Sequence, residues 1–468
     1  MVLHMARTKA NLGGGTRLAD YLSASLLARV YPAEQIDVVL REHSAQSQRE
    51  RSLPMRTMCY YCVALSLYPE CAYVAVFEAL AEGLNWCAGP AAGPLRNGSK
   101  SAERAACSAL SVSKSSVSAA RAKLGIKPLK SLHARCCVAL AEPVAQPEAF
   151  YAGLRLVAMD GSHFELPDEA SNVKAFGRPG SRTGFASYPQ AQCALLVECA
   201  THAILAAEIG AYRDAEWDLC ERLLPSLHAG MLCLADRGFN GVAQWQKARA
   251  TGAHLLWRTV GSRILPVMET LCDGSYLSVL YPPADTDGQP IQHKNKFNAN
   301  RTDGVTVRVI EYSLPELAHS GNDRGDDQIN SANHNPSAQP SGKKRSAPVK
   351  RYRLISSLLD PLATPALELA RVYHERWEVE AVFDELKTHL VERRRCLRSK
   401  TAEGVRQEFY GWVLAHYAVC WLMHAAASKE RIRIRTLSFT GNLRLIRITQ
   451  PLSGAFPPSA STTASSRV

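Results

Sequence analysis

The stretch PALELARVYHERWEVEAVFDELKTHL, residues 365–390, sets the frame in which the rest of this sequence is interpreted. Pro365 suits the first turn of a helix, and the apolar residues after it recur at helical spacing, so we expect one long helix over 365–390. At about 100° per residue, four polar residues share an arc of about 60° beside the apolar stripe: Tyr373, Arg376, Glu380 and Lys387. The pattern predicts a helix packed on a sheet, although a merely exposed, salt-bridged face would also give it.

Short apolar runs rich in β-branched residues precede this helix and predict the sheet. Strands are expected at 154–160, 193–199, 203–209, 231–236 and 254–260, with helices over 214–228 and 239–251. Consecutive strands followed by strand–helix alternation are typical of a mixed α/β sheet. Asp160 and Asp236 each end a run, where an acid projects into the crevice in which such sheets bind ligands. Either aspartate could instead cap a turn.

The composition is that of a folded and basic protein. The chain has 468 residues, of which 46% are apolar and 21% charged, and this excludes a wholly disordered chain. The net charge of +12 suggests a polyanionic partner, most often nucleic acid, although a basic enzyme without one remains possible. The CxxC pair Cys59 and Cys62 has no second pair at zinc-ligand spacing, so no structural zinc is expected.

Residues 409–428, FYGWVLAHYAVCWLMHAAAS, carry no Asp, Glu, Lys or Arg and are long enough to span a bilayer. The stretch contains His416 and His424, it stands alone, and basic residues crowd both of its sides. We therefore expect a buried core helix and no membrane partner.

The chain divides into segments of different texture. We expect a disordered start at 1–17, a helical domain at 18–135, a sheet core at 150–261 and 351–400, and a helical region with a flexible tail at 401–468. A β-rich insertion at 262–350 separates the two parts of the core, and its segment 318–350 is nearly devoid of apolar residues, as disordered segments are.

Residues 111–126, SVSKSSVSAARAKLGI, read as a polar turn followed by a serine-capped helix. This is the pattern of the second half of a helix-turn-helix, in which Lys114, Arg121 and Lys123 would meet DNA. A solvated helix face explains the same residues equally well.

The polar residues of 365–390 have the spacing Y-x2-R-x3-E-x6-K, which resembles the signature of DDE transposases of the insertion sequence 4 group. The segments VAMDGSHFELPD (157–168) and LADRGFNG (234–241) are similar to those that carry the two catalytic aspartates of that group. Residues 18–124 look like the group's helical N-terminal domain and 437–447 like its C-terminal end. The resemblance implies an α/β fold: an RNase H-like mixed-sheet catalytic core with a β-rich insertion, preceded by a helical DNA-binding domain.

The same resemblance implies that Asp160, Asp236 and Glu380 are the catalytic, metal-binding acids. Cleavage and strand transfer at phosphorus are in-line displacements that two divalent ions can assist. We expect Mg²⁺, with Mn²⁺ as a substitute, because hard cations take carboxylates, waters and phosphates. Asp384 lies on the same strip of the helix and competes with Glu380, but the signature spacing favours Glu380.

The other residues of the signature suit DNA. We expect Arg376 and Lys387 to clamp phosphates, and Tyr373 to donate a hydrogen bond to a phosphate oxygen. Trp377 could stack on an unpaired base, as a tryptophan at this place does in relatives, or it could pack in the core. The basic run 391–400 adds further DNA contacts: Arg393, Arg394 and Arg395. Residues 429–450 are also basic, and for both runs a solvated face is an equal alternative.

These observations predict the transposase of a bacterial insertion sequence. We expect it to bind double-stranded DNA at inverted-repeat ends as a homodimer and to cleave and join that DNA by cut-and-paste, in the cytoplasm at the nucleoid. A metal-dependent nuclease of the same fold without strand transfer, or a DNA-binding remnant of a transposon, would share many of these features. The intact set of three acids argues against the remnant.

Overall fold

The structure is a computed structural model. It describes residues 11–12, 16–17, 26–47, 54–73, 76, 113–181, 184–239, 241–282, 302–315, 349–391 and 396–448. Most of the expected disordered segments 1–17 and 318–350, and the tail after 448, lie outside these ranges. Within the first segment, β1 (Asn11–Leu12) and β2 (Thr16–Arg17) form a short antiparallel pair.

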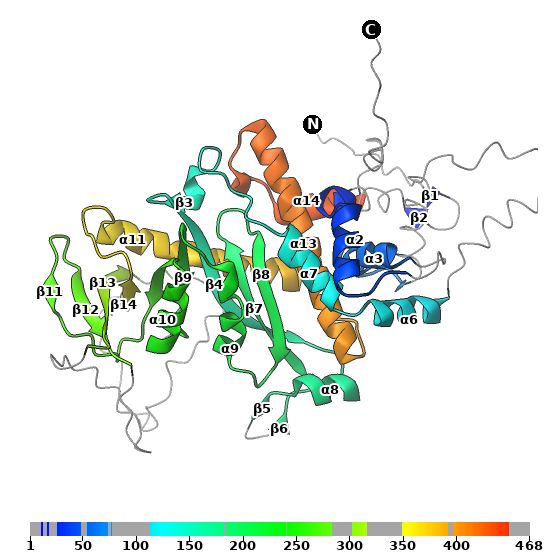
Figure 1. Cartoon of the computed structure of the whole chain (residues 1–468), viewed down its shortest axis with the longest axis horizontal. Helices are drawn as coiled ribbons and strands as arrows, with labels where there is room; N and C mark the ends of the chain where they lie inside the picture. Colours follow the sequence, from blue (N-terminus) through cyan, green and yellow to red (C-terminus); the bar gives the residue numbers. More distant parts are fainter. Residues whose placement is uncertain are drawn as a thin grey trace, which may run out of the picture.

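A ten-stranded mixed sheet forms the centre of the molecule (Figure 1). Its central strands are β4 (Leu154–Glu165), β7 (Gln190–Glu198), β8 (Ile204–Ala211), β9 (Met231–Ala235) and β10 (His254–Arg258). β4, β7 and β8 form an antiparallel meander, and β9 and β10 run parallel to β4 on its other side. The expected mixed α/β sheet is therefore confirmed.

Side-chain alternation in the strands explains why both faces of the sheet are covered. In β4, Val157 and Met159 pack in the core cluster that includes α9 (Glu216–Glu221) and α10 (Val242–Ala250). Leu156 and Ala158 face the opposite way, in the cluster that includes the helices after residue 365. Even-numbered residues of β4 therefore look toward the segment that carries the signature, and odd-numbered residues toward α9.

That segment is helical from Ala366 to Leu390, but it is not one uniform helix. It consists of α11 (Ala366–Tyr373), the 3₁₀ turn η3 (His374–Trp377), α12 (Glu378–Asp384) and the π-helical turn η4 (Glu385–Leu390). The single α-helix predicted over 365–390 is thus wrong in its winding. A 3₁₀ turn is tighter and a π turn wider than an α-helix, so a constant 100° per residue misplaces the later side chains.

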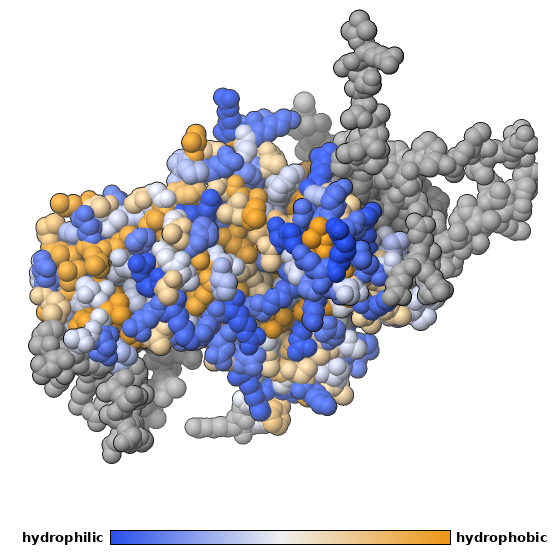
Figure 2. Space-filling model, viewed as in Figure 1, coloured by the Kyte–Doolittle hydropathy of each residue, from blue (hydrophilic) through white to orange (hydrophobic). Residues whose placement is uncertain are grey.

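The insertion extends the core sheet. Its strands are β11 (Glu269–Thr270), β12 (Tyr276–Leu280) and β13 (Val305–Pro315). They form an antiparallel meander that pairs with β14 (Val349–Ser356), and β14, most of which belongs to the second part of the core, pairs with β10. The fully buried Arg308 of β13 donates to Ser275 Oγ (2.8 Å) and to the Thr364 carbonyl (2.6 Å), just before α11. The insertion thereby fixes the start of the signature segment. Figure 2 shows apolar surface at this end of the molecule.

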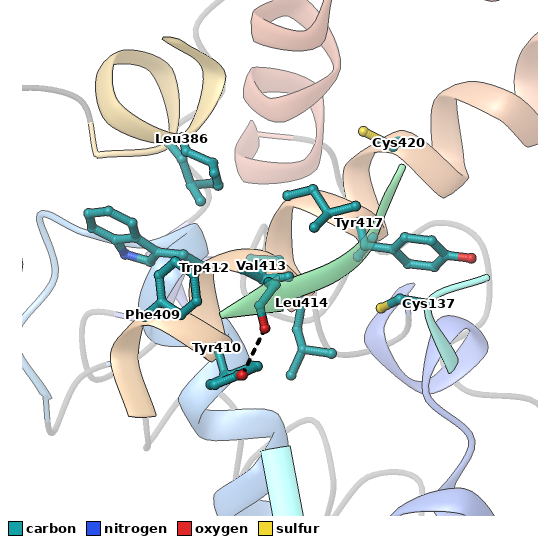
Figure 3. Close-up of a cluster of buried hydrophobic side chains, with 14 of the residues drawn as sticks. Cys137, Leu386, Phe409, Tyr410, Trp412, Val413, Leu414, Tyr417 and Cys420 are labelled. Atoms are coloured by element: carbon teal, nitrogen blue, oxygen red, sulfur yellow. Dashed lines mark hydrogen bonds between the residues drawn. The ribbon is translucent and has the colours of Figure 1, made fainter. Parts of the chain in front are cut away.

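The helices of the N-terminal region pack around one long C-terminal helix, α13 (Ala402–Glu430) (Figure 1). They are α2 (Ala33–Glu42), α3 (Met55–Leu67), α6 (Lys114–Leu124) and α7 (Lys127–Cys136). Phe409 and Val413 of α13 are buried on the side of Leu386 of η4, and Tyr417 is buried on the side of Cys137 (Figure 3). The stretch 409–428 is thus the core helix that the sequence predicts, and in the described part of the chain no helix meets the length and apolarity that a membrane span needs.

Smaller elements complete the described chain. They are η1 (Pro147–Ala149), β3 (Phe150–Tyr151), α8 (Ala170–Phe176), β5 (Gly180–Ser181), β6 (Gly184–Phe185), η2 (Leu224–Ser226), η5 (Ile434–Thr436) and α14 (Phe439–Ile448). The helix expected over 214–228 is interrupted, since α9 ends at Glu221 and η2 follows.

Candidate active site

The two aspartates lie beside each other at one end of the parallel pair β4 and β9. Asp236 directly follows β9, as predicted. The expectation that Asp160 ends its strand is wrong, because β4 pairs with β7 as far as Glu165. Pairing of β4 with β9 stops at Ala158, however, so Asp160 stands just past the end of the parallel ladder. Its even number directs it toward the signature segment.

Arg376 joins the first predicted acid to the third. Its Nη1 lies 3.3 Å from Asp160 Oδ2, and its Nη2 lies 2.9 Å from Glu380 Oε1. The residue is only 7% exposed, and its guanidinium lies over the Trp377 ring at 4.9 Å from the ring centre. Arg376 is therefore placed to neutralise two acids of the site, in addition to any contact it makes with DNA.

The carboxylates at this end of the sheet repel one another. Burial raises the pKa of Asp160 to about 7, against the nearby Arg376, which lowers it, and the charges of Asp236 and Glu216 add to the rise. Burial, with the charge of Asp236, also raises the pKa of Glu216. A cation among these groups would relieve both effects.

Glu216 is an acid of the site that sequence reasoning missed. It is the first residue of α9, and its Oε2 lies 3.6 Å from the point where a side chain on Gly238 would begin. A Cβ on Gly161 would come within 2.7 Å of Glu216 Cγ. Those two glycines follow Asp160 and Asp236 closely in the sequence, and they are the only signal that could have indicated an approaching side chain.

Lys387 and Tyr373 lie deeper than the sequence suggests. Lys387 Nζ donates to Ser162 Oγ (2.5 Å) and lies 5.3 Å from the centre of the Phe164 ring, and burial lowers its pKa. Tyr373 is 1% exposed, and burial raises the pKa of its hydroxyl well above the usual value, so the hydroxyl keeps its proton. Lys387 therefore contacts β4 at Ser162, two residues after Asp160, and does not lie on an open face.

Trp377 and Asp384 are not packed with the buried side chains of the site. Trp377 is 44% exposed, so it does not pack in the core, and its indole remains available beside Arg376. Asp384 accepts from Thr388 Oγ1 (2.7 Å) and pairs with His389 (3.2 Å). It makes neither of the ion pairs that link Glu380 to Asp160 through Arg376.

Of the predicted DNA-binding residues outside the signature, some are exposed, one packs between helices, and some lie outside the described residues. Lys114 and Lys123 are exposed on α6, whose cap Ser113 accepts from the Ser116 amide (3.1 Å). Arg121 instead donates to Gln407 Oε1 of α13 (2.9 Å), so its guanidinium serves packing between helices. Arg393, Arg394 and Arg395 lie outside the described residues.

Comparison with known proteins identifies the class. A family model described as "Transposase DDE domain" matches residues 151–417, and one described as "Insertion element 4 transposase N-terminal" matches residues 22–134. The chain therefore belongs to the DDE transposase family, in its insertion element 4 group. It is an enzyme, its mixed sheet is an RNase H-like core, and its class depends on divalent metal.

A particular relative can also be named. The chain is 24% identical over 449 residues to the transposase InsG for insertion sequence element IS4 of Escherichia coli strain K12. The match covers 94% of this chain and 84% of InsG.

The predicted metal-binding acids do not surround a single point. Among the side chains that the structure describes, no three of the His, Cys, Asp and Glu residues are grouped tightly enough to hold a metal ion. The donor set still fits a hard divalent cation, because all the nearby acids offer oxygen and repel one another.

Proposed function

We propose that this transposase binds the inverted-repeat ends of its insertion sequence and moves that element by cut-and-paste. The observation that carries the proposal is the ion-paired series Asp160–Arg376–Glu380, with Asp236 beside it. These residues come from three distant segments of the chain and meet at one end of β4 and β9. Convergence of acids from distant segments is what displacement at phosphorus needs.

In this proposal Asp160, Asp236 and Glu380 hold two Mg²⁺ ions, which Mn²⁺ can replace. Bound ions supply charge neutralisation and an activated oxygen for attack on the phosphodiester. Arg376 holds Asp160 and Glu380 together before the ions arrive. When Glu380 moves to its ligand position, the guanidinium is freed for a phosphate. Trp377, exposed beside Arg376, offers a ring for an unpaired base.

The helical region at 18–135 is the proposed DNA-end binding domain, with Lys114 and Lys123 on its exposed face. Arg393, Arg394 and Arg395 follow the signature closely in the chain and would add phosphate contacts. We propose that two protomers hold the two ends, since one set of three acids per chain serves one end. The site of action is the cytoplasm, on the DNA of the nucleoid.

The test is cleavage of a linear DNA that carries the native inverted repeats, with Mg²⁺ or Mn²⁺. We expect cut ends and products joined to target DNA. Asp160→Ala, Asp236→Ala and Glu380→Ala should each abolish cleavage and leave end binding largely intact, because affinity for DNA comes mostly from phosphate contacts. Cutting without joining would establish the nuclease alternative. Binding without cutting by the unmodified protein would establish the remnant.

A further inference from the structure

Glu216 reaches the catalytic end of the sheet from the side opposite to Glu380. Odd-numbered residues of β4 face α9, and Gly161 is one of them, so the chain has no side chain where Glu216 approaches. Asp160 and Ser162, on the other face, contact Arg376 and Lys387. The glycine therefore opens a passage past the end of β9 for an acid of α9.

The Glu216 carboxylate lies close to the glycines that follow the two aspartates. Its charge acts on Asp160, and it is itself affected by the charge of Asp236. A Cβ on Gly238 would lie 3.0 Å from Asp236 Oδ1 and 3.6 Å from Glu216 Oε2, which brings the two carboxylates to the same glycine. Glu216 thus belongs spatially with Asp160 and Asp236, although it is far from both in sequence.

Glu216 is half-buried and has no cationic partner in the part of the chain that the structure covers. Another acid of the same helix, Glu221, pairs with Lys247 (2.6 Å). A partly buried carboxylate without a cationic partner is one that a bound cation would stabilise.

Arg376, which pairs with two of the acids, also has one donor without a partner among the described residues. Arg376 is more than nine-tenths buried, and its Nε has no hydrogen-bond partner of good geometry among the described residues, whereas Nη1 and Nη2 bind Asp160 and Glu380. A buried donor without an acceptor is costly, and a phosphate oxygen would satisfy it. Arg376 supplies its one positive charge to two carboxylates, so the acids of the site are short of positive charge.

We propose that Glu216 is a fourth carboxylate of the metal site and helps Asp160 and Asp236 to hold a divalent ion. The inference rests on the proposed function. Asp160, Asp236, Glu216 and Glu380 offer four carboxyl groups against the one positive charge of Arg376, so in their ionised forms they would attract divalent ions. Gly161 has a defined part in this arrangement, because it leaves the space that Glu216 fills.

The test is Mn²⁺ binding to the full-length, metal-stripped protein, followed by electron paramagnetic resonance. Glu216→Gln keeps the shape of the side chain and removes its charge, and we expect Mn²⁺ affinity to fall about tenfold or more. Asp218→Asn changes an exposed acid of the same helix and should leave the affinity unchanged. Asp160→Asn should lose the ion. Thermal unfolding in EDTA checks that each variant is folded.

A second variant tests whether the space left by Gly161 is what admits the Glu216 side chain. Gly161→Ala would place a methyl group within 2.7 Å of Glu216 Cγ and displace that side chain, so it should weaken Mn²⁺ binding as Glu216→Gln does. The double variant should be no weaker than either single one, since both act through one carboxylate. Independent, additive losses would show that Gly161 does not act through Glu216.

The outcomes separate the inference from the proposed function. If Asp160→Asn loses Mn²⁺ while Glu216→Gln binds it within twofold of the unmodified protein, Glu216 is not a ligand and the proposed function stands. If the unmodified protein neither binds Mn²⁺ nor cuts the repeat-bearing DNA, the proposed function fails, and the inference fails with it.

Discussion

Ionisation of the partly buried Asp160 carboxyl group lowers the stability of the metal-free protein. Its pKa of about 7 lies above the usual value of a carboxyl group, so folding favours its protonated form. The cost to stability is absent at low pH, where Asp160 is protonated in both states; it grows as pH rises from the ordinary value of 3.8 to about 7, and it is complete above 7. A site that binds cations is expected to destabilise the protein in their absence, because function and stability make opposite demands on its charges.

Asp160→Asn should therefore stabilise the metal-free protein at pH 8, by about 1–3 kcal/mol, because the amide does not ionise. The gain should shrink as the pH falls to 5. Thermal unfolding in EDTA at both values measures it, with Asp218→Asn as the control for loss of an ordinary surface acid. A lower melting temperature for Asp160→Asn at pH 8 would show that its pair with Arg376 outweighs the repulsion.

The charge of Lys387 should affect the cleavage rate. Its ammonium group donates to Ser162 Oγ and lies 5.3 Å and 5.5 Å from the centres of the Phe164 and Phe383 rings. Lys387→Met keeps the apolar stem and removes the charge, so it should preserve folding and lower the cleavage rate roughly tenfold or more through misplacement of the reacting phosphate. Single-turnover cleavage and the salt dependence of DNA binding are the measurements. A change in the salt dependence alone would assign Lys387 to general affinity.

Some residues of the site could be predicted from the sequence, and others could not. The spacing of the signature pointed to Glu380 in preference to Asp384, and the strand ends pointed to Asp160 and Asp236. Glu216 could not be predicted, because only the packing of α9 across the sheet brings it to the site. The burial of Tyr373 and Lys387 was also unpredictable, since helical angles give a direction but not the depth of the neighbouring layer.

Among the elements, the π-helical turn η4 is fixed by a buried charge cluster on the side away from the acids. Glu385 accepts from His202 Nδ1 (3.0 Å) and His416 Nε2 (2.8 Å), and His202 Nε2 pairs with Glu378 (2.8 Å). These bonds connect η4 and α12 to the β7–β8 turn and to α13. The cluster therefore positions the segment that carries Glu380 and Lys387.

This cluster should make the stability pH-dependent. Burial lowers the pKa of His202, but Glu378 and Glu385 raise it more, to about 9, and the cluster lowers the pKa of Glu385 to about 2. The contribution of His202 is therefore full below its unfolded pKa of about 6.5 and is lost as pH rises through 9. The contribution of Glu385 is lost only in strong acid.

His202→Asn should lower the free energy of unfolding by about 2 kcal/mol or more at pH 7, since it leaves Glu385 and Glu378 short of a cation. Asparagine tolerates the left-handed backbone of residue 202, where φ is 60°, so the loss reports the imidazole and not strain. Urea unfolding at pH 7 and pH 10 measures it, and the difference between the two proteins should shrink at pH 10. A loss equal at both values would mean that the charge of His202 is unimportant.

At the scale of the whole molecule, α13 connects the N-terminal helices to the catalytic layer. Arg398, just before it, donates to the carbonyls of Leu65 (2.8 Å) and Cys71 (3.0 Å) at the end of α3. The apolar stretch 409–428 predicted a buried helix, and that prediction is confirmed. Its partners could not be predicted, because a helix that is apolar on all sides does not show in its sequence which neighbours cover each side.

The contact between α13 and α3 depends on a residue without a side chain. A Cβ on Gly411 would lie 2.5 Å from the Cys62 carbonyl oxygen and 3.2 Å from Ser66 Oγ, so the helices approach closely only because that atom is absent. Gly411→Ala should force them apart and destabilise the protein by about 1–3 kcal/mol, although alanine is the better helix former.

The same substitution tests whether the N-terminal helices fold with the catalytic core. Because α13 packs against both, we expect Gly411→Ala to lower the midpoint of one common urea transition, seen alike by tryptophan fluorescence and by far-ultraviolet circular dichroism. Gly261→Ala is the matched control, since nothing lies within 4 Å of a Cβ there. Two separated transitions in the variant would show that α3 and its neighbours unfold on their own, and that α13 belongs energetically to the catalytic core alone.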